Sequence, residues 1–476
     1  MVDILIIGSG ILGCCVAREL SKYESDILVL EKGNDVASGA TKANSGIVHA
    51  GFDALPGSRK AHFNILGQKM FESLSKELDF PYKKIGAIVL SFSEEGHDTL
   101  MTLMDRAKKN GVEGCEIIDG KKVRELEPSV SEEVVEGLLA KESAIVSPYE
   151  MCFAMAENAA TNGARFEFNK NVIDIRKGEN CLIVKCEDGT EYKSKVVINS
   201  AGVRSDEINN YISENKYEIT GRKGEYVLFD KDYSYITSRT LFQLPTKMGK
   251  GVLVSPTCHG NIIVGPNAND IEDKDLTWTT PEGLDEVWNK ALISVPTLPK
   301  GGIITQFSGI RAHCSENDFV IGFSKDVEGL YNLIGIESPG LTSSPAISVY
   351  VAKEVSEYMS LKEKVNFVKE RKAIKHITQM TNEELQKAIK ENKEYGHIVC
   401  RCEVVSEAEI REAIRRVPGA KDLDGIKRRT RAGMGRCQMG FCTPKMMEIL
   451  AQELNEPLKE VTKRGKGSEM IIERNK

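Results

Sequence analysis

The feature that most constrains the fold of this chain is a glycine motif near its N-terminus. The sequence DILIIGSG (3–10) is a short apolar run that ends in glycines, as a buried parallel strand does. Gly8, Gly10 and Gly13 form the pattern GxGxxG, and the following segment, ILGCCVARELSKY, has helical spacing. DILVLEK then reads as a second strand that ends near Glu31. This strand–helix–strand context predicts a site for a dinucleotide.

Each residue of the motif has a physical task in such a site. The first glycine allows a tight turn, the second lets the backbone approach a pyrophosphate, and the third lets helix and strand pack closely. The helix N-terminus then turns its positive dipole end toward the phosphates. Glu31, 18 residues past Gly13, can accept hydrogen bonds from a ribose hydroxyl. The alternative is a tight turn that binds nothing.

The bulk composition is that of a globular protein with two to four domains. The chain has 476 residues, of which 41% are apolar and 28% charged. Its net charge of −6 gives no general case for nucleic-acid binding. No apolar stretch approaches the roughly 20 residues of a membrane span, and no basic region precedes the first apolar run as in a signal peptide. We expect a cytoplasmic protein with no nucleic-acid partner and at most peripheral membrane association.

Four of the twelve cysteines cluster late in the chain, as Cys400, Cys402, Cys437 and Cys442. Clustering favours a metal site, whereas the eight scattered cysteines are expected to be buried, inert thiols. Ser406 begins a capping box, SEAE, so the cysteines are expected in loops beside helix termini. Zinc prefers C-x2-C pairs, which the C-x-C-x34-C-x4-C pattern fits poorly. A [2Fe–2S] cluster, zinc and empty thiols remain the alternatives.

Three further segments indicate which dinucleotide is bound. GNDVASGATKANSGIVHAGFDALPGSRKA (33–61) is rich in Gly, Ser and Asn, as a loop around a cofactor is, whereas a nicotinamide enzyme would continue with another strand and helix. This stretch, VVINSAGVRSDEI (196–208) and GLYNLIGIESPGLTSSPAISVYVAKEV (329–355) occur in the order seen in one family. They resemble the D-amino-acid-oxidase-like FAD-dependent oxidoreductases, which include glycerol-3-phosphate and L-2-hydroxyglutarate dehydrogenases.

The resemblance implies an α/β fold with a Rossmann-like FAD-binding domain and an antiparallel-sheet substrate domain. Together they would span residues 1–365, with FAD-binding pieces at about 1–80, 141–210 and 311–365 and substrate-domain pieces at about 81–140 and 211–310. It further implies that the motif glycines and Glu31 bind FAD. The other FAD contacts that it implies are Thr41, Asn44, Ser45, Val172, Ala201, Gly202, Gly340, Leu341 and Thr342. The last three would start a helix whose N–H groups face the flavin N1–C2=O edge.

The resemblance also indicates groups for a small anionic hydroxy substrate. Arg311, in GIRAH, matches the arginine with which the family clamps a substrate anion, because its fork suits two oxygens. A surface arginine is the alternative. Lys223, Glu225 and Tyr226, in GRKGEYVLFD, are expected in the roof over the flavin.

Two further stretches supply candidates of a different kind. The family resemblance implies that His49, in NSGIVHAG, lies beside the isoalloxazine ring as a base, a flavin tuner or a covalent flavin anchor, with a structural histidine as the alternative. Lys247 and Lys250 lie in a loop where they could meet a phosphate, although loop lysines are usually only solvated.

The phrase AGMGRCQMGFC (432–442) resembles the bacterioferritin-associated-ferredoxin-like [2Fe–2S] domain of anaerobic-type glycerol-3-phosphate dehydrogenases. It implies a small helical domain at 397–476, after an exposed connector at 366–396, with the cluster held by the four cysteines. Such a cluster would pass electrons singly from the flavin to a partner subunit or carrier, such as an NAD-linked flavoprotein or a quinone-linked subunit. The basic stretch KRRTR (427–431) is expected to dock an acidic surface of that partner.

These features together predict an FAD and [2Fe–2S] enzyme that oxidises sn-glycerol 3-phosphate to dihydroxyacetone phosphate. An L-2-hydroxyglutarate or other 2-hydroxy-acid dehydrogenase is one alternative, because NSGIVHAG, PGSRKA and KGEY resemble that subgroup. A non-catalytic electron-transfer subunit is another. Arg311, Lys223 and Glu225 argue against it, since a pure relay needs no anion clamp.

Overall fold

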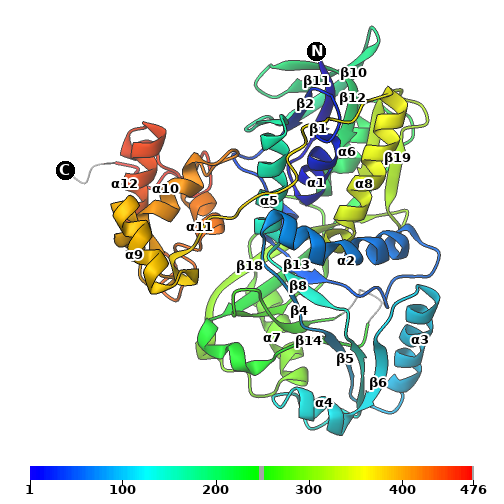
Figure 1. The fold of residues 1–476 in the computed structure, drawn as a ribbon. Coiled ribbons are helices and arrows are strands. Elements are labelled where there is room, and N and C mark those ends of the chain that lie inside the picture. The colour runs from blue at the N-terminus through cyan, green and yellow to red at the C-terminus, as the bar shows by residue number, and fades with distance from the viewer. Residues whose placement is uncertain (246–250, 474–476) are drawn as a thin grey trace.

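The computed structural model describes residues 1–245 and 251–473, so Lys247 and Lys250 lie outside the described residues. Two sheet-containing layers stand one above the other, and a small helical domain lies at their side, next to α5 (Figure 1). None of the helices described is both long and apolar enough to cross a membrane.

The upper layer is built on the predicted strand–helix–strand unit. β1 (Val2–Ile7) lies between β2 (Ile27–Leu30) and β12 (Glu191–Asn199) and is parallel to both. The sheet also contains β9 (Arg165–Glu167), β10 (Val172–Gly178), β11 (Cys181–Cys186), β19 (Val320–Phe323) and β20 (Leu330–Ile334). Because β1 has helices on one face and other chain segments on the other, its sequence is a continuous apolar run without alternation.

Helices that are far apart in sequence pack together on this sheet. They are α1 (Ile11–Leu20), α2 (Arg59–Leu78), α5 (Pro148–Thr161) and α8 (Gly340–Met359), with the short α6 (Ser205–Asn210) elsewhere on the layer. Ile4, Ile6 and Val29 of the sheet bury their side chains with Val16 of α1 and Ile347 of α8. The family resemblance anticipated this assembly of early and late segments, and the fold class predicted from it is confirmed.

The lower layer is a long mixed sheet. It contains β5 (Ala87–Ser91), β6 (Cys115–Asp119), β7 (Glu136–Ala140), β13 (Ile219–Phe229), β14 (Thr240–Gln243), β15 (Leu253–Pro256), β16 (Ile262–Gly265), β17 (Asn269–Ile271) and β18 (Ile303–Cys314). The helices of this layer are α3 (Gly96–Lys109), α4 (Gly120–Leu126) and α7 (Pro281–Ser294). The sheet is not wholly antiparallel, because β5 and β14 pair in parallel. That pairing joins two antiparallel halves from separate stretches of the chain.

A small sheet stands between the two layers. β8 (Ala144–Val146) pairs with β3 (Ile47–Val48) and with β4 (Tyr82–Lys84), antiparallel to both. The chain segment that holds His49 follows β3 directly. This sheet therefore fixes the position of that histidine relative to both layers.

The connector after α8 runs along the upper layer and is not a free linker. The Lys364 N–H donates to the carbonyl of Lys22, and Asn158 Nδ2 donates to the carbonyl of Val368. Arg371 forms an ion pair with the buried Glu157 at 2.8 Å. The connector then contains α9 (Asn382–Glu391), and its first half is docked on the upper layer rather than exposed (Figure 1).

The described part of the C-terminal domain, residues 397–473, contains a two-stranded sheet and three α-helices. The strands are β21 (Ile398–Cys400) and β22 (Val405–Ser406), and the helices are α10 (Glu407–Arg415), α11 (Leu423–Thr430) and α12 (Thr443–Leu454). The predicted capping box is present, with Ser406 Oγ accepting from the Glu409 N–H and Glu409 accepting from the Ser406 N–H. Apolar side chains from all three helices form a core of their own.

Candidate functional site

A cavity of about 2360 Å³ runs between the two sheet layers and reaches the C-terminal domain. Its walls include Gly8 and Gly10 of the glycine turn, His49, Arg311 of β18, and Arg428 of α11. Single-ligand pockets usually have roughly 300–1,000 Å³. The larger space is suited to a cofactor and a substrate together.

The glycine turn has the close packing that a dinucleotide site needs. Gly8 has φ +98°, and a Cβ there would lie 2.6 Å from the carbonyl oxygen of Ser200. A Cβ on Gly13 would lie 1.9 Å from the carbonyl oxygen of Gly8. Gly10 is the N-cap of α1, and a Cβ there would meet only Thr41 Oγ1, at 3.4 Å. The space beyond Gly10 therefore belongs to the cavity, at the positive end of α1, where Thr41 Oγ1 accepts from the N–H of Ile11 at 2.9 Å.

The predicted adenosine contacts surround the same end of the cavity. Glu31, Val172, Ala201 and Gly202 all line it. The Glu31 carboxylate accepts from Ser9 N–H at 2.9 Å and from Gly33 N–H at 2.8 Å, which fixes its orientation. A carboxylate has about four acceptor positions, so Glu31 retains capacity for a ribose hydroxyl.

The predicted flavin contacts converge at the other end. Asn44, Ser45, Gly340 and Leu341 line the cavity. The N-cap of α8 is Pro339, which has no side-chain acceptor, and the Gly340 N–H donates to the carbonyl oxygen of Glu337. Thr342 behaves differently, because it is fully buried and its Oγ1 accepts from the backbone N–H of His49 at 3.0 Å. It holds the histidine segment in place rather than lining the cavity.

The His49 side chain lies at the same end, beside the turn that precedes α8. Its Nε2 is 3.5 Å from Ser338 Oγ, and its ring centroid is 6.1 Å from that of Phe242. Asn64 Nδ2 donates to the His49 carbonyl oxygen at 3.1 Å. The backbone of this residue is thus held on both sides, and its imidazole belongs to the cavity wall.

Arg311 lies in the opposite wall with a second arginine that the sequence did not single out. Its Nη2 donates to the carbonyl oxygen of Asn267 at 2.8 Å. A Cβ on Gly224 would lie 3.3 Å from this nitrogen, so the glycine leaves room for the guanidinium. The neighbouring Arg222 is paired with Asp270 at 2.7 Å, and this hydrogen bond raises the pKa of Arg222 above its usual range. The pair makes this wall cationic.

An ion-pair group near the flavin end was also missed. Lys60 Nζ lies 2.9 Å from Glu337 Oε1, and His313 Nδ1 lies 3.0 Å from the same oxygen. Burial by itself raises the pKa of Glu337, but Lys60 and His313 hold it below its usual range. Lys60 and Glu337 both line the cavity. No sequence signal connects these residues, because they come from separate helices, turns and strands.

Lys223 and Glu225 are not where the sequence suggested. Neither lines the cavity, whereas Arg222 and Tyr226 of the same strand do. Lys223 Nζ pairs with Glu225 Oε1 at 2.7 Å, and both side chains are almost fully buried. The Glu225 carboxylate also accepts from the N–H and the hydroxyl of Thr280, at the start of α7. Side chains alternate between the two faces of a strand, so these two hold α7 on the sheet instead of facing a substrate.

The four clustered cysteines lie in two pairs. Cys402 Sγ is 3.6 Å from Cys437 Sγ, while Cys400 interacts with Cys442. The Cys442 thiol lowers the pKa of Cys400 to about 6 against the effect of burial, and the N–H of Gly433 donates to the Cys400 sulfur at 3.5 Å. Cys400 is therefore disposed to be a thiolate, the form that binds metals. Contrary to expectation, Cys400 ends a strand and not a loop.

This pairing fits a two-iron cluster better than a single ion. Within residues 1–245 and 251–473, no three metal-binding side chains are close enough together to hold one ion. Zinc needs four ligands around one centre, whereas four cysteines in a [2Fe–2S] cluster serve two irons. Val404, Gln438 and Met439 next to the cysteines have positive φ values of 53°, 45° and 75°. Such strained conformations cluster at functional sites.

The basic stretch at 427–431 is not a free docking surface, which corrects the expectation. Asp35, in the loop after β2, accepts from Arg428 at 2.9 Å and from Arg429 at 2.6 and 2.7 Å. The Arg429 guanidinium also lies 4.0 Å from the ring centroid of Phe153 on α5. Since Arg428 and Arg429 are 8% and 5% exposed, these charges fasten the C-terminal domain to the FAD-binding layer.

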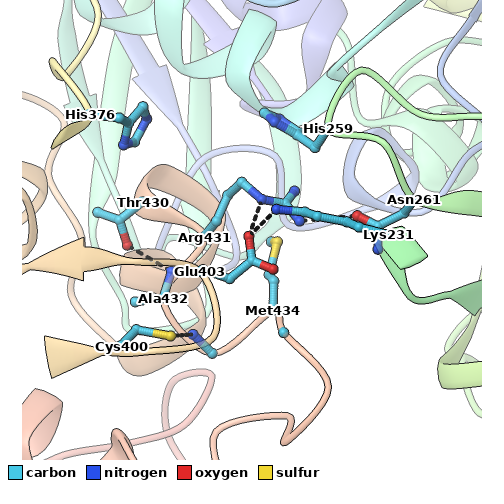
Figure 2. A network of polar contacts seen from close by, with 12 residues as sticks. Lys231, His259, Asn261, His376, Cys400, Glu403, Thr430, Arg431, Ala432 and Met434 are labelled. Atoms are coloured by element: carbon cyan, nitrogen blue, oxygen red, sulfur yellow. Dashed lines mark hydrogen bonds and ion pairs between the residues drawn. The ribbon is translucent and has the colours of Figure 1, made fainter. Parts of the chain in front are cut away.

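A second polar network joins the cysteine loop to the lower layer (Figure 2). Glu403, next to Cys402, accepts from Arg431 at 2.8 Å and from Lys231 at 2.6 Å. Arg431 also donates to Asn261 Oδ1 at 3.1 Å. The cysteine loops are therefore held against the walls of the cavity, rather than in a domain that moves independently.

Comparison with known proteins agrees with this geometry. A model of the FAD-dependent oxidoreductase family matches residues 3–354, and a model of the BFD-like [2Fe–2S] binding domain matches residues 398–452. A glycerol 3-phosphate dehydrogenase of Caloramator mitchellensis is 44% identical over 474 residues, covering 99% of this chain and 98% of the relative. The similarity thus includes the C-terminal domain.

Two other proteins match a smaller part of the chain. The structure of dithionite-reduced L-α-glycerophosphate oxidase from Mycoplasma pneumoniae, with FAD bound, is 31% identical and superposes with a TM-score of 0.75. It covers 78% of this chain and 98% of the oxidase. The mitochondrial L-2-hydroxyglutarate dehydrogenase of Arabidopsis thaliana is 27% identical over 407 residues, covering 74% of this chain and 83% of the relative.

Proposed function

Because the chain belongs to the family of FAD-dependent oxidoreductases, we propose that it oxidises sn-glycerol 3-phosphate to dihydroxyacetone phosphate and passes the electrons to a separate acceptor. FAD and a [2Fe–2S] cluster are its cofactors. FAD, when bound, supplies the hydride acceptor, and the cluster supplies a carrier that takes electrons one at a time.

The observation that carries the proposal is the full-length similarity to the Caloramator dehydrogenase. Proteins that bear the name L-2-hydroxyglutarate dehydrogenase share less identity, and the one described above leaves about a quarter of this chain unmatched. A cluster domain fits an enzyme that gives its electrons to a carrier, because reaction with O2 at the flavin needs no such relay.

Arg311 and Arg222 are the groups that we assign to the substrate anion. Both line the cavity on the wall opposite the glycine turn, and an arginine fork can bind two oxygens of one phosphate. Because the Arg222 guanidinium is already paired with Asp270, we assign the main contact with the substrate anion to Arg311. Its one short contact at 2.8 Å goes to a backbone carbonyl, which orients the side chain without neutralising it.

His49 is the group that we assign to the substrate hydroxyl proton. Loss of hydride from the carbinol carbon requires the hydroxyl proton to leave, and a histidine imidazole can accept that proton. Thr342 and Asn64 hold the His49 backbone, so the imidazole has a defined position in the cavity wall. Tuning of the flavin and covalent attachment to it are the competing roles, and a flavin that stays with acid-precipitated protein would indicate attachment.

Anaerobic reduction of the bound flavin tests the proposal. Glycerol 3-phosphate should bleach the flavin absorbance rapidly, whereas L-2-hydroxyglutarate and L-lactate should not. Bleaching by L-2-hydroxyglutarate alone would show that the protein is a 2-hydroxy-acid dehydrogenase instead. No bleaching by any of the three, in protein with a full complement of FAD, would favour a non-catalytic electron-transfer subunit.

A further inference from the structure

We infer that the exposed side of the Cys402–Cys437 pair, framed by Arg401, Arg436 and Phe441, docks an acidic protein that accepts one electron at a time. This inference rests on the proposed function, because it supplies the surface for the acceptor that the proposed function requires. We call the five residues the cysteine-pair face. It replaces the 427–431 stretch, which lies inside the molecule.

The two cysteine pairs differ in their access to solvent. Cys400 and Cys442 are 1% and 3% exposed and belong to the core of the C-terminal domain. Cys402 is exposed and Cys437 is half-buried. Electron transfer between proteins weakens steeply with distance, so an acceptor has to approach the cluster from the side of Cys402 and Cys437.

Two exposed arginines flank this accessible pair. Arg401 and Arg436 directly precede Cys402 and Cys437, and both are exposed. A Cβ on Gly435 would lie 2.4 Å from Cys402 Cβ, so the turn that bears Arg436 packs against Cys402. Within the described part of the chain, neither guanidinium has an ion pair or hydrogen bond to a protein group.

Among the arginines described in this domain, only Arg464 shares with these two the lack of an ion-pair partner. Six other arginines of the same domain are paired with acidic residues: Arg411, Arg415, Arg416, Arg428, Arg429 and Arg431. The acidic residue nearest in sequence to the exposed cysteines, Glu403, is occupied by Arg431 and Lys231. The cysteine-pair face therefore has a local positive charge in a protein whose net charge is −6.

An exposed aromatic ring completes the cysteine-pair face. Phe441 immediately precedes Cys442 and is 89% exposed, although large aromatic side chains are usually well covered in a monomer. Exposed aromatic and arginine side chains are typical of the residues that dominate protein–protein interfaces. The charge selects an acidic partner, and the cluster selects a one-electron carrier.

Charge reversal on this face tests the inference. The holoprotein with Arg401→Glu/Arg436→Glu is compared with a control, Lys121→Glu/Lys193→Glu, which changes the net charge equally at exposed sites on α4 and β12. Cytochrome b5, an acidic one-electron haem protein, and the basic cytochrome c serve as probes. Association is measured by surface plasmon resonance at low and high salt, and cytochrome reduction by stopped flow.

We expect the arginine variant to lose about tenfold or more in association rate with cytochrome b5 at low salt, together with most of its salt dependence. The control should behave as wild type. If the arginine variant loses its cluster absorbance, Arg401→Gln/Arg436→Gln is measured instead, with a smaller loss expected. Equal association of the arginine variant and the control, or faster association of wild type with cytochrome c than with cytochrome b5, overturns the inference.

The same samples separate this inference from the proposed function. Bleaching of the flavin by glycerol 3-phosphate is recorded without any cytochrome, so it reports only on the substrate site. Normal bleaching with no effect of charge reversal rejects the docking surface alone. Charge-dependent binding of cytochrome b5 without bleaching rejects the substrate assignment and leaves the surface standing.

Discussion

The buried ion pair between Asp35 and the two arginines of α11 should control how firmly the C-terminal domain is docked. The Asp35 carboxylate is 0% exposed and accepts three charge-assisted hydrogen bonds, at 2.9, 2.6 and 2.7 Å. Unit charges about 4 Å apart attract by about 4 kcal/mol at an effective dielectric constant of 20, and desolvation offsets part of this. Asp35→Asn leaves Arg428 and Arg429 buried without a counterion, which typically costs about 3–5 kcal/mol.

This cost can be converted into a change in docking. Since about 1.4 kcal/mol corresponds to a factor of ten, the undocked population should rise roughly 10²- to 10³-fold or more. The fraction of undocked molecules is measured by limited proteolysis of the connector, which contacts the same layer and links it to the C-terminal domain. Asp424→Asn is the matched control, because Asp424 pairs with Lys463 at a half-exposed site worth at most about 1 kcal/mol. Equal cleavage rates for the two variants would refute the reasoning.

The same pair predicts undocking in acid. Burial alone raises the pKa of Asp35, but Arg429 and Arg428 together hold it below its ordinary value of 3.8. A carboxyl group with a depressed folded pKa contributes its stability fully above the unfolded value and loses it as pH falls through the folded value. We therefore expect the pair to keep the domain docked at neutral pH and to release it only below pH 3.8. The Asp35→Asn variant should lack this acid transition.

The remaining predictions concern the two cofactor sites and the substrate wall. Gly10→Val should fold, because only Thr41 is near, but should lose FAD, and full flavin absorbance would contradict this. Cys437→Ser should lose iron by elemental analysis while substrate still bleaches the flavin; retained iron or stoichiometric zinc would be evidence against the cluster. Arg311→Lys should raise KM about tenfold or more, and an unchanged kcat/KM would remove it from the site. Lys223→Met should lower the free energy of unfolding, measured in urea, by about 3–5 kcal/mol and leave KM nearly unchanged. A rise in KM as large as that expected for Arg311→Lys would instead indicate that Lys223 contacts the substrate.

Much of the local structure follows from the sequence, because the signals involved span only a few residues. The apolar run of β1 and the glycine turn predicted the first strand, helix and turn, and the SEAE sequence predicted the cap of α10. The order of the FAD segments, through its family resemblance, indicated which distant pieces share a domain. The metal-binding cysteines could also be predicted, since cysteine spacing is a property of the sequence.

The orientation of the substrate wall was decided by the tertiary structure. The KGEY sequence identifies β13, but a strand shows its residues alternately to two faces, and sequence does not say which face meets the cavity. Lys223 and Glu225 lie on the face that packs against α7. Arg222 and Tyr226 therefore lie on the other face, which lines the cavity. A shift of one residue in register would exchange the two sets.

The role of the basic stretch was likewise settled only by the fold. KRRTR reads as a solvated cationic surface until Asp35, 393 residues before Arg428, is brought against it. A charge in isolation favours water, whereas the same charge beside a buried carboxylate favours the interior, and sequence contains no measure of that proximity. The sequence by itself therefore determined the cofactors and the secondary structure around them. The tertiary structure decided which charges became internal fasteners and which, such as Arg401 and Arg436, stayed at the surface.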